Sequence, residues 1–172
     1  PVVADLLVHG TTPYVPPTGG GHTKPTEPAW ENPYSDVSDG HWAYDAIRFV
    51  TEEKLFQGVT DGSFAPNMTM SRAMLATVLY RAAGSPSVTT SVGFTDAPGG
   101  KWYSDAVNWA ATEGIVKGVG GSRFAPDDNV SREQIAAILH RYAIASGEDA
   151  KANTAVLNSF GDSTAVHAWA AD

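Results

Sequence analysis

The chain has 172 residues, of which 42% are hydrophobic and 17% charged, and its formal net charge is −8. This composition is typical of a globular protein with one domain or two small ones, and it differs from that of a disordered chain. The negative charge makes nucleic acid and anionic membrane surfaces poor partners, and no apolar run approaches the roughly 18 residues that span a bilayer. Cysteine is absent, which excludes disulfides and thiolate metal sites.

Residues 1–33 differ in composition from the rest of the chain. The segment 1–10, PVVADLLVHG, fits either one strand or the end of an upstream domain. The segment 11–33 is dense in proline, glycine and threonine, which indicates an extended linker with polyproline character. We therefore assign no fold to this part of the chain.

From residue 34 onward the sequence repeats itself with a period of 60 residues. Residues 34–83 placed over 94–143, without a gap, give 17 identities in 50 positions. A third copy starts near residue 160, where FGDSTAVHAWAAD matches the openings YSDVSDGHWAYD and FTDAPGGKWYSD with one extra residue. Repeat modules of this size bury their apolar faces against their neighbours. The repeat predicts modules at 34–93 and 94–153, and the start of a third at 154–172.

The opening of each full repeat predicts a helix. Apolar residues at helical spacing, which begin at Trp42 and Trp102, predict helices over 42–55 and 102–114. Because the two tryptophans begin these apolar stripes, we expect core packing to be their main role, with stacking on a sugar ring as the alternative.

A second helix is predicted in each repeat after a loop. Gly58 and Gly118 follow the first helices and favour a helix stop there. Ser71 and Ser131 are suited to cap the second helices, and only the second copy has the capping-box pattern. The second helices are expected over 71–83 and 131–145. The fold class is therefore mostly α.

Arg72 and Arg132 stand directly after the two capping serines. A helix amino terminus carries a partial positive charge, so a cation in its first turn is mildly unfavourable. The same field, the free N–H groups of the first turn and an arginine fork would together hold an anion such as a carboxylate. The alternative is that each arginine pairs with a nearby carboxylate or packs over an aromatic ring.

These motifs, in the same order twice and with a third opening, resemble the S-layer homology modules of bacterial surface proteins. The resemblance covers about residues 34–172 and rests on the openings YSDVSDGHWAYDAI and FTDAPGGKWYSDAV and on the G…FAP…SR middles at 58–73 and 118–132. It implies tandem helical modules, usually three, around a pseudo-threefold axis with the first helices in a central bundle. The third module is incomplete in this chain.

The resemblance also implies a function and its residues. It implies an extracellular protein that is held non-covalently to the cell wall by secondary cell wall polysaccharide, typically through pyruvylated amino sugars. The motif arginines, Arg72 and Arg132, are the implied principal contacts. The module openings and the glycine-containing loop add Asp36, Trp42, Gly62, Asp96, Trp102 and Gly121. The aspartates have an alternative role as helix caps or in Asx-turns.

This sequence departs from the family pattern at three points. Serine replaces the motif threonine, which keeps the capping hydroxyl, and Met74 stands where the motif glutamate is expected in the first copy. The third opening is not followed by an arginine motif within the sequence. These departures concern the first site and the closed threefold arrangement.

The sequence carries no recognisable catalytic or metal-binding pattern. No nucleophile motif, phosphate loop or acid–base set is present, so we expect no enzyme activity and no cofactor. The carboxylates lack the spacing of a calcium loop and the five histidines are scattered, so no metal site is expected. The alternatives are a self-assembly module, completed by another chain or by the apolar segment 2–8, and the anchor region of a larger cell-surface hydrolase.

Overall fold

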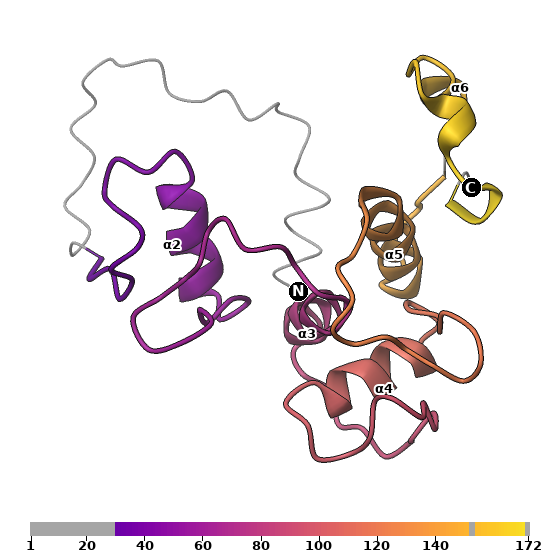
Figure 1. Ribbon diagram of the computed structural model, residues 1–172, viewed down its shortest axis with the longest axis horizontal. Helices are drawn as coiled ribbons and strands as arrows, with labels where there is room; N and C mark the ends of the chain where they lie inside the picture. The colour runs from indigo at the N-terminus through magenta and orange to yellow at the C-terminus, as the bar shows by residue number, and fades with distance from the viewer. Residues whose placement is uncertain (1–29, 152–153, 171–172) are drawn as a thin grey trace. The chain divides into compact units, whose positions relative to one another are not determined.

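The computed structural model describes residues 30–151 and 154–170 (Figure 1). The predictions for residues 1–29 lie outside the described residues. The α-helices are α2 (Tyr44–Glu52), α3 (Arg72–Ala82), α4 (Ser104–Thr112), α5 (Arg132–Ala145) and α6 (Thr154–Leu157). Two short 3-10 helices follow, η1 (Ser163–Ala165) and η2 (Ala168–Ala170). The described residues form no β-strand, only isolated bridges, so the prediction of a mostly α fold is confirmed.

The chain forms two compact units that divide between Met68 and Thr69. This division falls inside the first repeat, because its second helix, α3, packs against α4, the first helix of the second repeat. The two helices of the first repeat, α2 and α3, thus belong to different units. The sequence modules at 34–93 and 94–153 are units of repetition, and as domain boundaries they stay a prediction.

The first unit is built around α2. Tyr34, Val37 and Ile47 form its buried core, and Phe64 packs against them from the loop after the helix. The Tyr34 and Phe64 rings lie 5.2 Å apart between centroids. The Tyr34 hydroxyl lies 3.2 Å from the Thr51 hydroxyl of α2, which ties the repeat opening to the helix.

The second unit contains α3, α4 and α5 and has the larger core. Phe124, Ile115 and Val107 are its largest fully buried side chains. The short helix η2 packs against α5, as α4 packs against α3. The second helix of each full repeat therefore contacts the opening of the next repeat (Figure 1).

The first helices end earlier than the sequence predicts. α2 ends at Glu52 and α4 at Thr112, and Lys54 and Gly114, with φ of 58° and 71°, take the left-handed position after each end. The prediction that Gly58 stops a helix, and likewise Gly118, is therefore wrong.

The two glycines serve a different purpose, which is close packing. A Cβ atom on Gly58 would lie 2.6 Å from the Ser63 carbonyl oxygen, and one on Gly118 would lie 2.7 Å from the Arg123 carbonyl oxygen. In each repeat the glycine therefore lets a tight loop close on itself.

The second helices begin as predicted. The Ser71 hydroxyl accepts a hydrogen bond of 3.3 Å from the Met74 N–H, and the Ser131 hydroxyl accepts one of 3.3 Å from the Gln134 N–H. The Gln134 side chain returns a bond to the Ser131 N–H, which completes a capping box in the second repeat. The capping serines fix where the motif arginines enter their helices.

Candidate functional site

Arg72, the first residue of α3, is a buried cation that is bonded to the second repeat. Only 6% of its surface is exposed. Its Nε atom donates a hydrogen bond of 2.8 Å to the Phe124 carbonyl, and its Nη2 atom donates one of 2.8 Å to the Lys117 carbonyl. Its Cζ atom lies 4.8 Å from the centroid of the Phe124 ring, a cation–π distance. Burial lowers the pKa of Arg72, while the charges of Asp128 and Asp96 act in the opposite direction.

The amino terminus of α3 is also occupied by the protein. The backbone N–H of Arg72 donates to the Asp128 carbonyl at 2.9 Å, and that of Ala73 donates to the Pro126 carbonyl at 3.0 Å. With the Ser71 cap, these bonds satisfy the N–H groups that the first turn would offer an anion. The prediction of free N–H groups at this helix end is therefore wrong, because the loop of the second repeat covers it.

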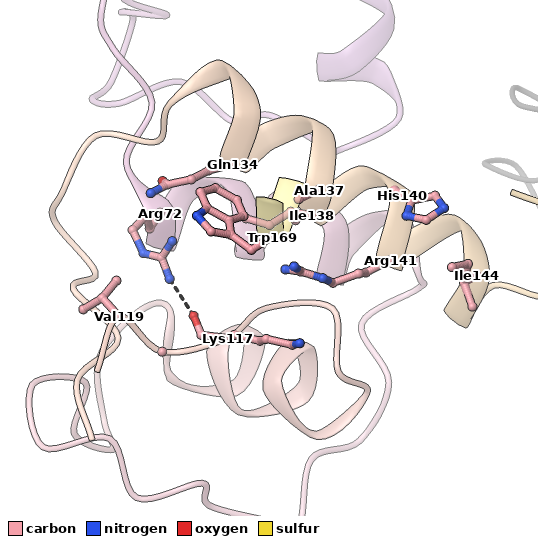
Figure 2. Close-up of a pocket in the computed structure, with 11 residues that line it drawn as sticks. Arg72, Lys117, Val119, Gln134, Ala137, Ile138, His140, Arg141, Ile144 and Trp169 are labelled. Atoms are coloured by element: carbon pink, nitrogen blue, oxygen red, sulfur yellow. Dashed lines mark hydrogen bonds between the residues drawn. The ribbon is translucent and has the colours of Figure 1, made fainter. Parts of the chain in front are cut away.

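A cavity of about 680 Å³ lies beside Arg72 in the second unit. Its walls come from α5 and from the loop after α4, and the indole of Trp169, from η2, stands in it (Figure 2). The other lining residues are Arg72, Lys117, Gly118, Val119, Gln134, Ala137, Ile138, His140, Arg141 and Ile144. The volume is within the range of roughly 300–1,000 Å³ that is usual for small-molecule sites.

The lining of this cavity is basic. Arg72, Lys117 and Arg141 bring three cationic side chains to it, and none of the described residues that line it is an aspartate or a glutamate. The His140 ring is held by a hydrogen bond of 2.7 Å from Nε2 to the Ala150 carbonyl. In a chain whose net charge is −8, a cavity with this lining favours an anionic ligand.

The segment that carries Trp169 is attached to α5 through a contact between His167 and Glu133. The His167 Nδ1 atom lies 3.0 Å from the Glu133 carboxylate, and the His167 N–H donates to that carboxylate at 3.3 Å. The His167 and Trp169 rings stack with centroids 5.8 Å apart. Hydrogen bonding from His167 lowers the pKa of Glu133. The third opening thus supplies an aromatic face to the cavity, attached at the start of α5.

Arg132 occupies the position of Arg72 one repeat later, but its environment differs. Arg132 is exposed, and among the described residues its guanidinium has no hydrogen-bond or ion-pair partner. The carbonyls that hold Arg72 belong to residues 45 and 52 positions further along the chain. Arg132 is thus the free cation that the anion hypothesis needs, yet it does not line the cavity.

The two aspartates of the repeat openings hold the loops in place. Asp36 accepts hydrogen bonds from the N–H groups of Phe64 and Ala65, at 2.9 and 2.8 Å. Asp96 makes the equivalent bonds with Phe124 and Ala125, at 2.7 and 2.9 Å. These bonds follow the structural alternative, in which the carboxylates cap turns. Neither aspartate lines the cavity.

The glycine-containing loop shows which residues correspond between repeats. The Gly62 carbonyl accepts a hydrogen bond from the Ser35 N–H at 2.9 Å, and in the second repeat the Ser122 carbonyl accepts it from Thr95 at 2.9 Å. The structural counterpart of Gly62 is therefore Ser122, one residue after Gly121. Gly62 and Gly121 both have positive φ, of 75° and 57°.

Trp42 and Trp102 do not pack in the core. Trp42 is 92% exposed and Trp102 is 62% exposed, so the expectation of core packing is wrong for both. The reason is that α2 and α4 begin two residues after these tryptophans, which therefore do not lie on the buried helix faces. Among the described residues, their aromatic ring contacts are with neighbours in sequence, His41 for Trp42 and Tyr103 for Trp102.

Of the binding residues proposed from the sequence, only Arg72 lines the cavity, and Lys117, Arg141 and Trp169 were missed as site residues. A signal for two of them was present, since Arg141 repeats Arg81 at the 60-residue period and Trp169 stands in the third opening where the first two have Trp42 and Trp102. Lys117 replaces Gln57 at that period and gives no such signal.

One known family matches the chain, once in each of the two full repeats. The family model of the S-layer homology domain matches residues 33–74 and 93–136, which together make up half of the chain. The chain belongs to the S-layer homology domain family. Domains of this family anchor surface proteins to the cell wall, so the chain is part of a bacterial surface protein.

The S-layer homology region has relatives of several kinds. It is 34% identical over 113 residues to a cellulosome-anchoring protein of Acetivibrio thermocellus, a match that covers 63% of this chain and 25% of the relative. It is 30% identical over 139 residues to a surface-layer 125 kDa protein of Lysinibacillus sphaericus, covering 81% of this chain and 11% of the relative. An amylopullulanase of Thermoanaerobacterium thermosulfurigenes is 29% identical over 141 residues, which are 82% of this chain and 7% of the relative. The chain thus spans a quarter or less of the length of these proteins.

None of the described helices is both long enough and apolar enough to cross a membrane.

Proposed function

We propose that this S-layer homology region anchors a surface protein by binding secondary cell wall polysaccharide, through an anionic sugar of the pyruvylated amino sugar type. The observation that carries the proposal is the cavity of about 680 Å³ with Lys117 and Arg141 in its lining and no carboxylate among its described lining residues. A pyruvate ketal is a carboxylate carried on a sugar ring, so it matches both the charge and the aromatic face of Trp169.

The relatives support the anchoring part of the proposal. One of them is named a cellulosome-anchoring protein and another a surface-layer protein. The match to an amylopullulanase favours a larger hydrolase as one kind of protein that such a region holds at the wall. In this proposal the region itself binds and does not catalyse.

The experiment is cosedimentation of the purified chain with bacterial wall sacculi. We expect the chain to sediment with intact sacculi and to stay in solution when the sacculi have been stripped of their secondary polysaccharide. The released polysaccharide, added to intact sacculi, should compete for the chain. Equal binding to intact and stripped sacculi would refute the polysaccharide as the ligand.

The packing also supports a pseudo-threefold arrangement of the modules, which we propose as in the family. In the second unit α3 packs against α4, and α5 packs against η2, so each contact links one repeat to the opening of the next. In the proposed arrangement, the same contact repeated at each step would place successive openings around one axis. Spin-label distances between α2 and α4 would test it, and a distance incompatible with adjacent first helices would contradict it.

The surface of α5 favours self-association as a second function. Leu79 of α3 is 5% exposed where that helix packs against α4, whereas Leu139, its counterpart on α5, is 46% exposed. We propose that a second copy of the chain covers this part of α5 by apolar contact. Sedimentation velocity over a range of concentrations should show a dimer that Leu139→Glu abolishes. A monomer at every concentration would refute self-association.

A further inference from the structure

The three cationic side chains that line the cavity differ in how many contacts they make with the rest of the protein. An arginine has five N–H donors, and the guanidinium of Arg72 directs its Nε and Nη2 atoms at backbone carbonyls of the second repeat. The residue as a whole is 6% exposed, and its guanidinium lies over the Phe124 ring. Arg72 therefore has a fixed position, and its main contacts are with the protein.

Lys117 and Arg141 differ from Arg72 in this respect. Lys117 is exposed and Arg141 is half-buried, and across residues 30–151 and 154–170 no carboxylate lies within ion-pair distance of either cation. Figure 2 shows the Arg141 guanidinium and the Lys117 ammonium reaching into the cavity from different elements, α5 and the loop after α4. Two unpaired cations on separate walls of one cavity are suited to hold one anionic group between them.

Arg72 connects to this pair through the backbone. The carbonyl that accepts the Nη2 hydrogen bond belongs to Lys117 itself. Asp96 also holds the loop after α4, because its carboxylate accepts hydrogen bonds from the N–H groups of Phe124 and Ala125. The buried arginine thus sets the position of the residue whose ammonium faces the cavity.

The rest of the cavity suits a ring more than a second charge. Ile138 and Ile144 contribute apolar surface from α5, and Trp169 contributes an indole that Figure 2 shows between the arginines Arg72 and Arg141. The C–H groups of a sugar ring pack favourably on such an aromatic face, while its charged substituent stays at the cations.

We propose that Lys117 and Arg141 are the anion-binding residues of this chain, that Trp169 binds the sugar ring, and that Arg72 is a positioning residue that shapes the Lys117 wall. This inference rests on the proposed function, because it takes the wall polysaccharide as the source of the anion. The chemistry it requires is a saccharide with an acidic substituent, either a carboxylate or a phosphate.

The test uses variants of the whole chain that remove the charge and leave a polar, uncharged side chain in its place. Lys117→Gln and Arg141→Gln are each expected to weaken binding of released wall polysaccharide about tenfold, the usual scale for a charge-assisted hydrogen bond. Arg141→Lys should recover only part of the loss, because an ammonium lacks the planar fork of a guanidinium. Both glutamine variants should also reduce the dependence of affinity on salt concentration.

Lys101→Gln is the matched control. Lys101 is exposed, does not line the cavity, and its replacement changes the net charge by the same amount as Lys117→Gln. We expect its affinity to equal that of the wild type. If Lys101→Gln weakens binding as much as Lys117→Gln, overall charge explains the effect and the assignment is overturned.

Three small probes identify the anion by calorimetry: an amino sugar with a pyruvate ketal, the same sugar with a phosphate ester, and the uncharged sugar. Tighter binding of the ketal identifies a carboxylate and tighter binding of the phosphate ester identifies a phosphate, and both support the pair. Equal binding of the uncharged sugar overturns it.

The proposal and the proposed function fail in different ways. A wild-type chain that binds no released polysaccharide refutes wall anchoring by this ligand. A wild type that binds, with folded Lys117→Gln and Arg141→Gln variants that bind equally well, refutes only the roles given to these two residues.

Discussion

The guanidinium of Arg72 donates a 2.8 Å hydrogen bond to the carbonyl of Lys117, so the motif arginine of the first repeat fixes the backbone of the second. The same side chain bonds the Phe124 carbonyl and stacks on the Phe124 ring. An arginine placed unfavourably in the first turn of a helix is thereby explained without an external ligand. In the proposed site, the role of Arg72 is to set the shape of the cavity wall.

The first prediction concerns the stability contributed by this arginine. Arg72→Ala leaves two carbonyls without their charged donor and removes the contact with Phe124, so the free energy of unfolding should fall by roughly 2–4 kcal/mol. Arg72→Lys should lose about half as much, because one ammonium does not reproduce the fork. Urea denaturation followed by circular dichroism measures both. Arg132→Ala, at the exposed counterpart, should change the same free energy by less than about 0.5 kcal/mol, and an equal loss there would contradict the contrast between the repeats.

The local features of the fold followed from the sequence because their causes are local. The 60-residue repeat, the mostly α class and the serine caps at Ser71 and Ser131 each depend on residues within one turn or one repeat. The end of α2 was misplaced because Lys54, a residue without a left-handed preference, takes the position that a glycine usually marks, whereas α4 does end at such a glycine, Gly114.

The cavity could not be predicted in the same way. Lys117 and Arg141 come together only because the loop after α4 and the helix α5 line one space, and no periodicity in the sequence encodes that contact. The environment of Arg72 was also hidden, since its partners lie in the next repeat. The exposure of Trp102 followed from a shift of two residues in the start of α4, which moved the tryptophan off the helix.

The second prediction concerns the close approach at Gly118. Gly118→Ala would place a Cβ atom 2.7 Å from the Arg123 carbonyl oxygen and 3.0 Å from Cε1 of Phe94. The loop must shift to accept it, so we expect a loss of about 1–3 kcal/mol in the free energy of unfolding. Weaker polysaccharide binding should accompany it, because Lys117 is the adjacent residue. Gly99→Ala, where nothing lies within 4 Å of the added atom, is the control and should be neutral to within about 0.5 kcal/mol. Equal effects of the two variants in thermal denaturation would refute the steric explanation.

The third prediction concerns the stability in acid of the hydrogen bonds by which Asp36 and Asp96 hold their loops. Desolvation raises the pKa of Asp96, but hydrogen bonds from the N–H groups of Phe124 and Ala125 outweigh it and hold the pKa below 3.8. For Asp36 the N–H groups of Phe64 and Ala65 are the main causes of the lowered pKa.

Because the folded-state pKa of each group is the lower one, its stabilising contribution is present above about pH 3.8 and is lost as the pH falls through the folded value. Asp96→Asn should lower stability at pH 7 and flatten its decline below pH 4, measured as melting temperature against pH. Asp105→Asn removes an exposed carboxylate that accepts no hydrogen bond among the described residues, and it should keep the wild-type decline. If the melting temperature of Asp96→Asn declines in acid as that of the wild type does, the Asp96 carboxylate does not stabilise the loop in this way.

The last prediction concerns the attachment of the Trp169 segment to α5. Hydrogen bonding from His167 is the largest cause that lowers the pKa of Glu133 below 4.5. The lowered pKa belongs to the docked state, so the contribution of this contact to docking is present above about pH 4.5 and is lost as the pH falls through the folded value. Glu133→Gln should therefore release the segment already at pH 7.

The fluorescence of Trp169, obtained as the difference between the wild type and Trp169→Phe, reports this release. At pH 7 the difference spectrum in the Glu133→Gln background should shift to the red, towards that of an exposed indole. The wild-type difference spectrum should reach the same position only below about pH 4.5. Glu113→Gln, which removes an exposed carboxylate at the end of α4, serves as the control and should leave the spectrum unchanged. A Trp169 spectrum that is independent of pH and of Glu133 would show that the apolar contact with α5 holds the segment without the carboxylate.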